Sequence, residues 1–271
     1  MLVAFRTDGA EWQTTLMLTT TGRIEARRGD NTGTVLATSD SVVTADAYTH
    51  FECRVACDDT NGAVEVRING VTVLNISGVD TQAAATNAMA EAWVGNWGGS
   101  PNADRYIDDM FCWDTNGSQN NDFIGDRRVL TLFPDQDTAE ADWAVEDGAS
   151  PPGSGYEAIN DETPDDDTSY IYTDQVGDVS EFGLQDTPEG ISAISAIVAV
   201  NRMRKDDAGD CNVQCSLVSQ GSPIAEANGA DRPITEVYTY WQDVFELDPS
   251  TAAPWTPESF DAALLKFERT S

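Results

Sequence analysis

The stretch GAVEVRINGVTVLNISG, residues 62–78, decides the fold class. Polar and apolar side chains alternate on both sides of Asn69 and Gly70, and Val64, Val66 and Ile68 share one face of the first half. Alternation of period two predicts a strand with one buried face, and an Asn-Gly pair between two such runs is typical of a two-residue hairpin turn. The stretch therefore predicts an antiparallel hairpin within a sandwich or jelly roll.

The same pattern extends outward over most of the chain. Strands are predicted within residues 15–30, 49–59, 91–99, 105–114, 127–133, 169–174, 191–221 and 235–247. In residues 191–221 the turn at 206–209 predicts a hairpin of two long strands. Only residues 256–268 have helical spacing, with Thr256, Glu258 and Ser259 as an N-terminal capping signature. The prediction is an all-β protein with one short helix near its C-terminus.

Composition divides this β protein into two domains. After Trp113 the sequence DTNGSQNND is polar and rich in turn-forming residues, as domain joints are. We expect a first domain at 1–114, a joint at 115–124 and a second β domain at 125–271. A long acidic passage at 134–169 is too long for an ordinary connection and predicts a functional or partner-contacting loop.

Charge and cysteine content exclude several classes of function. The 271 residues include 47 Asp and Glu against 15 Lys and Arg, a formal charge of −32, which repels phosphate backbones. No apolar run is long enough to cross a membrane, and the first residues do not resemble a signal peptide, so we expect synthesis in a cytoplasm and no membrane insertion. Cysteines four apart on straight strands, about 13 Å, are too distant for a disulfide within either pair.

Three stretches of the first domain carry a resemblance to a known fold. ARRGDNTGTVLATSD (26–40), residues 49–81 and YIDDMFCWD (106–114) are similar to a laminin-G-like, or concanavalin A-like, jelly roll. Residues 106–143, 161–173 and 243–256 resemble structural proteins of tailed bacteriophages that join such a jelly roll to a second β domain. The resemblance implies an N-terminally short jelly roll, followed by a second β-sandwich domain with a terminal helix at 256–268.

The resemblance also implies a role for acidic residues at the rim of the jelly roll. In the family, the Asp of the closing strand fixes rim loops by hydrogen bonds or, in some relatives, through calcium. The candidate ligands are Asp30, Asn31, Asp104 and Asp108. Calcium is thus a possible cofactor, beside the alternative that these side chains are solvated or bind backbone groups; no other cofactor is expected.

Catalytic chemistry finds little support in the sequence. Neighbouring residues of a strand point to opposite faces, so Asp108 and Asp109 cannot flank one scissile bond together. Glu140 and Glu146 of EADWAVE match a loose glucanase motif, a match that such an acidic chain produces by chance. The acidic run at 160–168 lacks the spacing of a calcium-binding EF-hand loop and is read as a solvated, repulsive loop. We therefore expect no enzyme.

A sugar-binding site is the remaining possibility among the aromatic residues. Trp93 and Trp97 lie four apart and could stack on a sugar ring, with Asn96 and Asn102 as hydrogen-bonding partners, or they could belong to the core. The favoured prediction is a non-enzymatic virion protein, a capsid decoration or head-fibre protein or a tail component. Its expected partners are other virion proteins and further copies of itself, and its expected location is the virion. The alternatives are an adhesin for a host-surface glycan and, more remotely, a glucanase.

Overall fold

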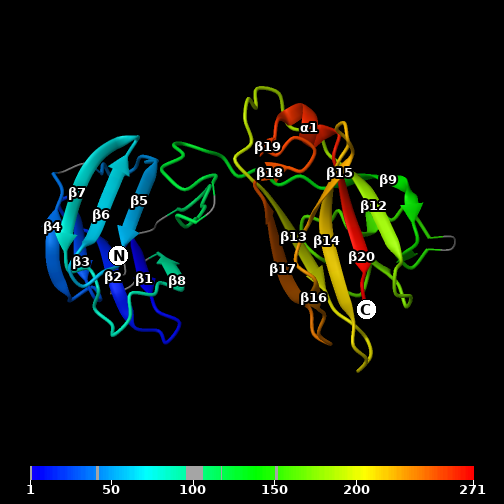
Figure 1. Cartoon of the computed structure of the whole chain (residues 1–271), viewed down its shortest axis with the longest axis horizontal. Coiled ribbons are helices and arrows are strands. Elements are labelled where there is room, and N and C mark those ends of the chain that lie inside the picture. Colours follow the sequence, from blue (N-terminus) through cyan, green and yellow to red (C-terminus); the bar gives the residue numbers. More distant parts are fainter. Residues whose placement is uncertain (1, 41–42, 96–105, 117, 150–151) are drawn as a thin grey trace. The chain divides into compact units, whose positions relative to one another are not determined.

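The computed structural model of the chain describes residues 2–40, 43–95, 106–116, 118–149 and 152–271 (Figure 1). The chain divides into two compact units, Met1–Val129 (unit 1) and Leu130–Ser271 (unit 2). Regular structure in the described residues is strand apart from the 3-10 turn η1, Tyr156–Ala158, and the helix α1, Pro257–Asp261. The all-β class with a short helix near the C-terminus is confirmed.

Unit 1 contains two antiparallel sheets. The first has the order β4-β3-β2-β1-β8 and the second the order β5-β6-β7. The strands of the first sheet are β1 Val3–Arg6, β2 Trp12–Leu18, β3 Ile24–Arg28, β4 Thr34–Thr38 and β8 Glu91–Val94; those of the second are β5 Phe51–Ala56, β6 Gly62–Ile68 and β7 Val71–Val79. One core cluster joins Leu16 and Ile24 of the first sheet with Val64 and Val66 of the second, so the two sheets pack as a sandwich.

The hairpin at 62–78 forms as predicted. Asn69 and Gly70 connect β6 to β7 with φ values of 49° and 77°, and Ile68 pairs with Val71 across the turn. Positive φ at both central residues is the geometry that favours Asn-Gly in a two-residue hairpin. Val64 and Val66 are fully buried, as the alternation requires.

The end of unit 1 differs from the prediction. Residues 106–114 and 127–133 form no strand, and Asp109 has a left-handed backbone with φ of 51°, which an extended strand does not accommodate. The predicted joint at 115–124 lies inside unit 1. Arg54 pairs with Asp122 at 3.2 Å, and the Gly125 amide donates to Glu52 at 2.9 Å, so this segment is held against β5.

Unit 2 is built around a six-stranded antiparallel sheet. Its order is β15-β14-β20-β12-β9, with β16 also pairing with β14. Its strands are β9 Pro134–Ala141, β12 Val179–Leu184, β14 Asn212–Ser219, β15 Ala225–Asn228, β16 Arg232–Pro233 and β20 Leu264–Arg269. Three two-stranded ribbons accompany it: β10 Ala144–Glu146 with β11 Tyr170–Tyr172, β13 Ile197–Met203 with β17 Thr239–Phe245, and β18 Leu247–Asp248 with β19 Ala253–Pro254.

Only the first part of the predicted helix at 256–268 is helical, and from Leu264 the chain forms the strand β20. The cap is correct, because Thr256 and Ser259 form a reciprocal capping box, but α1 ends at Asp261. Figure 1 shows β20, in red, between β14 and β12. Leu265 and Phe267 are buried there, since residues two apart share one face of a strand. Burial in the sheet outweighs the local helical spacing.

Two further expectations for unit 2 are wrong. Strands β13 and β14 do not form a hairpin: β13 pairs with β17, and β14 pairs with β20. The acidic passage at 134–169 is not a plain loop, because it contains β9, β10 and η1. Asp137 holds this passage together by accepting from the amides of Gly155 at 3.0 Å and Tyr156 at 2.7 Å.

Candidate interaction surface and other sites

The ribbon of β13 and β17 has one buried and one exposed face. Ile197, Ala199, Met203 and Trp241 pack against the core of unit 2, whereas their neighbours along the strands point away from it. The outward residues define the outer ribbon face: Val198, Val200, Arg202, Tyr240, Gln242 and Val244. Because the inward residues pack against the core, the outward residues face away from it.

The outer ribbon face is unusually apolar for an exposed surface. Val198, Val200 and Val244 expose 48%, 55% and 62% of their surface, and Val198 lies directly opposite Val244 in the register. None of the six outward residues is Asp or Glu, although 47 of the 271 residues are acidic. Contiguous exposed apolar surface of this kind marks protein interaction sites more often than plain solvent-facing surface.

The ribbon also has open edges. Within the described residues, β13 and β17 pair as strands only with each other, although the Gln242 carbonyl of β17 already accepts from Arg232 at 2.7 Å. Unpaired backbone N–H and C=O groups along such an edge accept a strand from another chain. The surface therefore offers both apolar area and edge hydrogen bonds to a partner.

The acidic segment, residues 160–168, contacts one end of the outer ribbon face. Arg202 donates to both oxygens of Asp166, at 2.6 and 2.9 Å, and lies 4.9 Å from the ring centre of Tyr240, its partner in the register. Hydrogen bonds from Arg202 hold the pKa of Asp166 below its usual value. A two-point contact of this kind fixes orientation as well as distance.

A second pair continues this contact. Arg204 donates to Asp167 at 2.7 Å, and the Tyr238 hydroxyl donates to the same carboxylate at 2.8 Å. These hydrogen bonds, from Arg204 first and Tyr238 second, lower the pKa of Asp167. The prediction that residues 160–168 form a solvated, repulsive loop is therefore incomplete, because two of its carboxylates bind Arg202 of β13 and Arg204 just after it.

The predicted sugar-binding residues are only partly described by the structure. Trp93 lies on β8 and exposes 37% of its surface. Its indole N–H donates to Glu91 at 2.9 Å, and the Arg6 guanidinium lies 4.5 Å from its ring centre. Arg6 thus already contacts a face of the ring on which a sugar would stack. Asn96, Trp97 and Asn102 lie outside the described residues.

The structure describes three of the four predicted calcium ligands, Asp30, Asn31 and Asp108. Asp30 accepts from the Thr32 amide at 2.8 Å and hydroxyl at 2.7 Å, and these bonds lower its pKa. The Asn31 carbonyl accepts from Arg27 at 3.1 Å, and Asp108 accepts from the Asp109 amide at 2.9 Å. Asp104 is not among the described residues. Across those residues, no group of three or more His, Cys, Asp or Glu side chains is placed to hold a metal ion.

Glu140 and Glu146, the predicted glucanase pair, fall on strands of two different sheets, β9 and β10, and both are exposed. Neither lines the pocket around His50 or the pocket beneath the β13–β17 ribbon.

One of these two pockets, of about 250 Å³, lies in unit 1 and is lined by His50, Asn69, Gly70, Gly125 and Asp126. It brings the single histidine of the chain near a carboxylate. The lining contains no hydroxyl or thiol nucleophile, so a nucleophilic triad is not assembled here.

The five cysteines are all unpaired thiols, and the prediction of no disulfide within either closely spaced pair is confirmed. Burial raises the pKa of Cys215 to about 12, although the Asn201 side chain and the Arg232 charge act in the opposite direction. A thiol with so high a pKa is almost fully protonated near neutral pH and is a poor nucleophile.

Comparisons with protein-family models, with curated proteins and with solved structures found no match. The resemblance to a laminin-G-like jelly roll and to phage structural proteins therefore stays a prediction. No helix in the described part of the chain is long and apolar enough to cross a membrane.

The outer ribbon face was missed in the sequence, although a signal for it is present. Residues 197–200, Ile-Val-Ala-Val, are apolar at every position, whereas a strand with one wet face alternates. An uninterrupted apolar run predicts a strand that is apolar on both faces. Such a run indicates either burial on both sides or, as here, an exposed apolar face.

Proposed function

We propose that the protein is a non-enzymatic structural protein that works by assembling with other protein chains, first of all with further copies of itself. The observation that carries the proposal is the outer ribbon face, which combines exposed apolar side chains with open strand edges. A virion of a tailed bacteriophage is the setting that the sequence resemblance suggests. Capsid decoration and a place in the tail or fibre are both compatible with such a surface.

The charge of the chain supports a contact at this surface. Two chains of formal charge −32 repel each other at long range, and this repulsion falls with added salt. None of the six residues of the outer ribbon face is acidic, and the carboxylate of Asp166 at one end of the face is paired with Arg202, so two copies can meet there with less local repulsion than elsewhere. We expect self-association that strengthens as salt rises, whereas a complex with a cationic partner weakens as salt rises.

Light scattering on the purified chain between about 50 mM and 1 M salt tests the proposal. The wild-type chain is expected to form a closed oligomer, and Val200→Glu is expected to give a monomer because it places a charge at the centre of the contact. Val176→Glu is the matched control, since Val176 is 63% exposed in the same unit but lies in a turn away from the ribbon. A wild-type monomer at every salt concentration would contradict self-assembly.

A further inference from the structure

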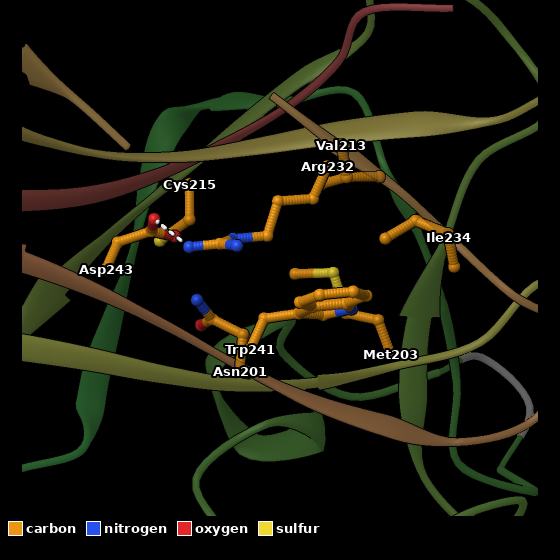
Figure 2. A pocket seen from close by; sticks show the side chains of 8 residues that line it. All are labelled: Asn201, Met203, Val213, Cys215, Arg232, Ile234, Trp241 and Asp243. Carbon is orange, nitrogen blue, oxygen red and sulfur yellow. Dashed lines mark hydrogen bonds and ion pairs between the residues drawn. The ribbon is translucent and has the colours of Figure 1, made fainter. Parts of the chain in front are cut away.

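A small pocket lies beneath the ribbon, between β13 and β17 on one side and β14 and β16 on the other (Figure 2). Its lining consists of Asn201, Met203, Val213, Cys215, Arg232, Ile234, Trp241 and Asp243. Its volume is about 10 Å³, which is the room taken by one water-sized particle. The pocket therefore excludes sugars and polyatomic ions such as phosphate.

Three nitrogen atoms in this lining have no protein acceptor. They are Nδ2 of Asn201, Nε of Arg232 and Nε1 of Trp241, and each is fully buried. Five side-chain atoms in the described residues share this condition, and three of the five belong to this pocket. Indole and guanidinium nitrogens only donate hydrogen bonds. A ligand that accepts hydrogen bonds would therefore satisfy these donors.

The arginine cannot turn away to find another acceptor. Its Nη2 donates to Asp243 and to the carbonyl of Gln242, both at 2.7 Å, and its guanidinium lies 5.3 Å from the ring centre of Trp241. Figure 2 shows the guanidinium reaching Asp243, with the indole of Trp241 beside the arginine side chain. These contacts fix the donor in place, as a binding site requires.

Asp243 is held just as firmly. Its Oδ1 accepts from the Ala230 amide at 3.0 Å as well as from Arg232, and its side chain is 7% exposed. A Cβ atom at Gly229 would lie 2.7 Å from the Asp243 carboxyl carbon and would overlap the Cys215 carbonyl, so only glycine allows this approach. The backbone of the sheet is thus shaped around the Arg232–Asp243 pair.

We propose that this pocket binds one small hydrogen-bond acceptor, a chloride ion or a water molecule, through Asn201, Arg232 and Trp241. Both ligands share the required chemistry and size. Three donors exceed the two lone pairs of a water molecule and suit a halide, whereas the carboxylate of Asp243 repels an anion and accepts from water. The bound particle joins the ribbon to the large sheet and supports the buried side of the outer ribbon face.

Crystals of the full chain, grown in chloride and then transferred to bromide, test this proposal. Anomalous signal from bromide at hydrogen-bonding distance from the three nitrogens establishes the halide. An oxygen peak at the same place without anomalous signal establishes water. If the pocket is filled by protein atoms that accept from these nitrogens and holds no separate density, the proposal is wrong.

Two variants separate a specific site from general packing. Trp241→Phe keeps an aromatic ring but removes the N–H, and we expect bromide affinity to fall about tenfold or, for water, the peak to disappear. Trp255→Phe is the matched control, because Trp255 Nε1 is also buried without a protein acceptor but does not line this pocket. Unchanged density in Trp241→Phe would overturn the role of the indole. Should Trp241→Phe not fold, the wild-type crystals decide alone.

Discussion

The two units differ in how far along the chain each strand finds its partner. Among the described residues of unit 1, β1 to β4 pair in sequence order, as do β5 to β7, and only the pairing of β1 with β8 is distant. In unit 2, β13 pairs with β17, β14 with β20 and β9 with β12. Short turn signals are sufficient to specify the first arrangement. The second depends on which apolar faces meet in the core, and no local signal encodes that choice.

The largest expected effect is on the distant pairings of unit 2. Phe267 is 6% exposed in β20 and contacts the rings of Trp143 and Phe182. Phe267→Ala should lower the free energy of unfolding of unit 2 by about 4 kcal/mol, because it leaves a cavity in the core. Hydrogen exchange followed by mass spectrometry should show faster exchange in β12, β14 and β20.

The matched variant in unit 1 is Ile24→Ala, which removes a fully buried side chain from β3. It should accelerate exchange in the strands of unit 1 and leave unit 2 unchanged. If either substitution accelerates exchange equally in both units, they do not behave as separate cores, and the comparison between them fails.

A smaller loss of stability is expected from changing Gln13, which makes a long-range contact within unit 1. Gln13 is fully buried, donates to the carbonyls of Thr86 and Ala88, and accepts from the amides of Ala83 and Ala84. Gln13→Leu leaves these backbone groups unsatisfied and should lower the free energy of unfolding by about 3 kcal/mol. Urea unfolding measures the loss, and exchange should rise most at residues 83–88.

The exposed Gln175 provides the control for that substitution, and Gln175→Leu should change stability little. An equal loss in the two variants would mean that the buried amide network contributes nothing specific.

The turn at Asn69 and Gly70 should contribute less to the free energy of unfolding than the contacts of Gln13 do. Gly70 has φ of 77° with open space where a Cβ atom would lie, so Gly70→Ala introduces backbone strain but no clash. We expect a loss of about 1 kcal/mol in the free energy of unfolding. Gly9→Ala is the control, because Gly9 lacks a positive φ and its added Cβ would make only an ordinary contact with Thr7. Equal midpoints in urea for both variants would refute the strain at Gly70.

The smallest effect concerns the acidic segment against the ribbon. Asp166 and Asp167 have pKa values below the ordinary 3.8, so their contacts with Arg202 and Arg204 contribute stability above pH 3.8. This contribution is lost as the pH falls through the lowered pKa values, because the protonated carboxyl groups no longer pair with arginine. NMR relaxation of residues 161–169 should show the segment held at pH 7 and released in strong acid.

The double variant Asp166→Asn, Asp167→Asn should show the released state at both pH values. A segment that stays ordered at neutral pH in this variant would show that other contacts hold it.

The sequence was sufficient for features that are encoded locally. The alternation around Asn69 and Gly70 predicted the hairpin, and Thr256 with Ser259 predicted the start of α1. Residues 264–268 carry both a helical spacing and an alternation, and only the sheet of unit 2 decides between them.

The candidate surface escaped prediction for a related reason. Ile197 to Val200 are apolar throughout, and their spacing alone does not tell which of the two faces meets the core. Asp166 and Asp167 lie more than thirty positions from Arg202 and Arg204, and charge patterning along the chain gave no register for that contact. Residues so far apart in the sequence come into contact only through the folded sheet.

The central position of β20 has a consequence for how the protein is made. A ribosome produces β9, β12 and β14 well before residues 264–269, and at bacterial or eukaryotic rates the interval from β9 to β20 is on the order of ten seconds. For part of that time β12 and then β14 lack their shared neighbour, while the hairpins of unit 1 can already close. The protein is therefore most prone to aggregation while unit 2 is incomplete on the ribosome. The high density of negative charge counteracts aggregation at that stage, because like-charged chains repel each other.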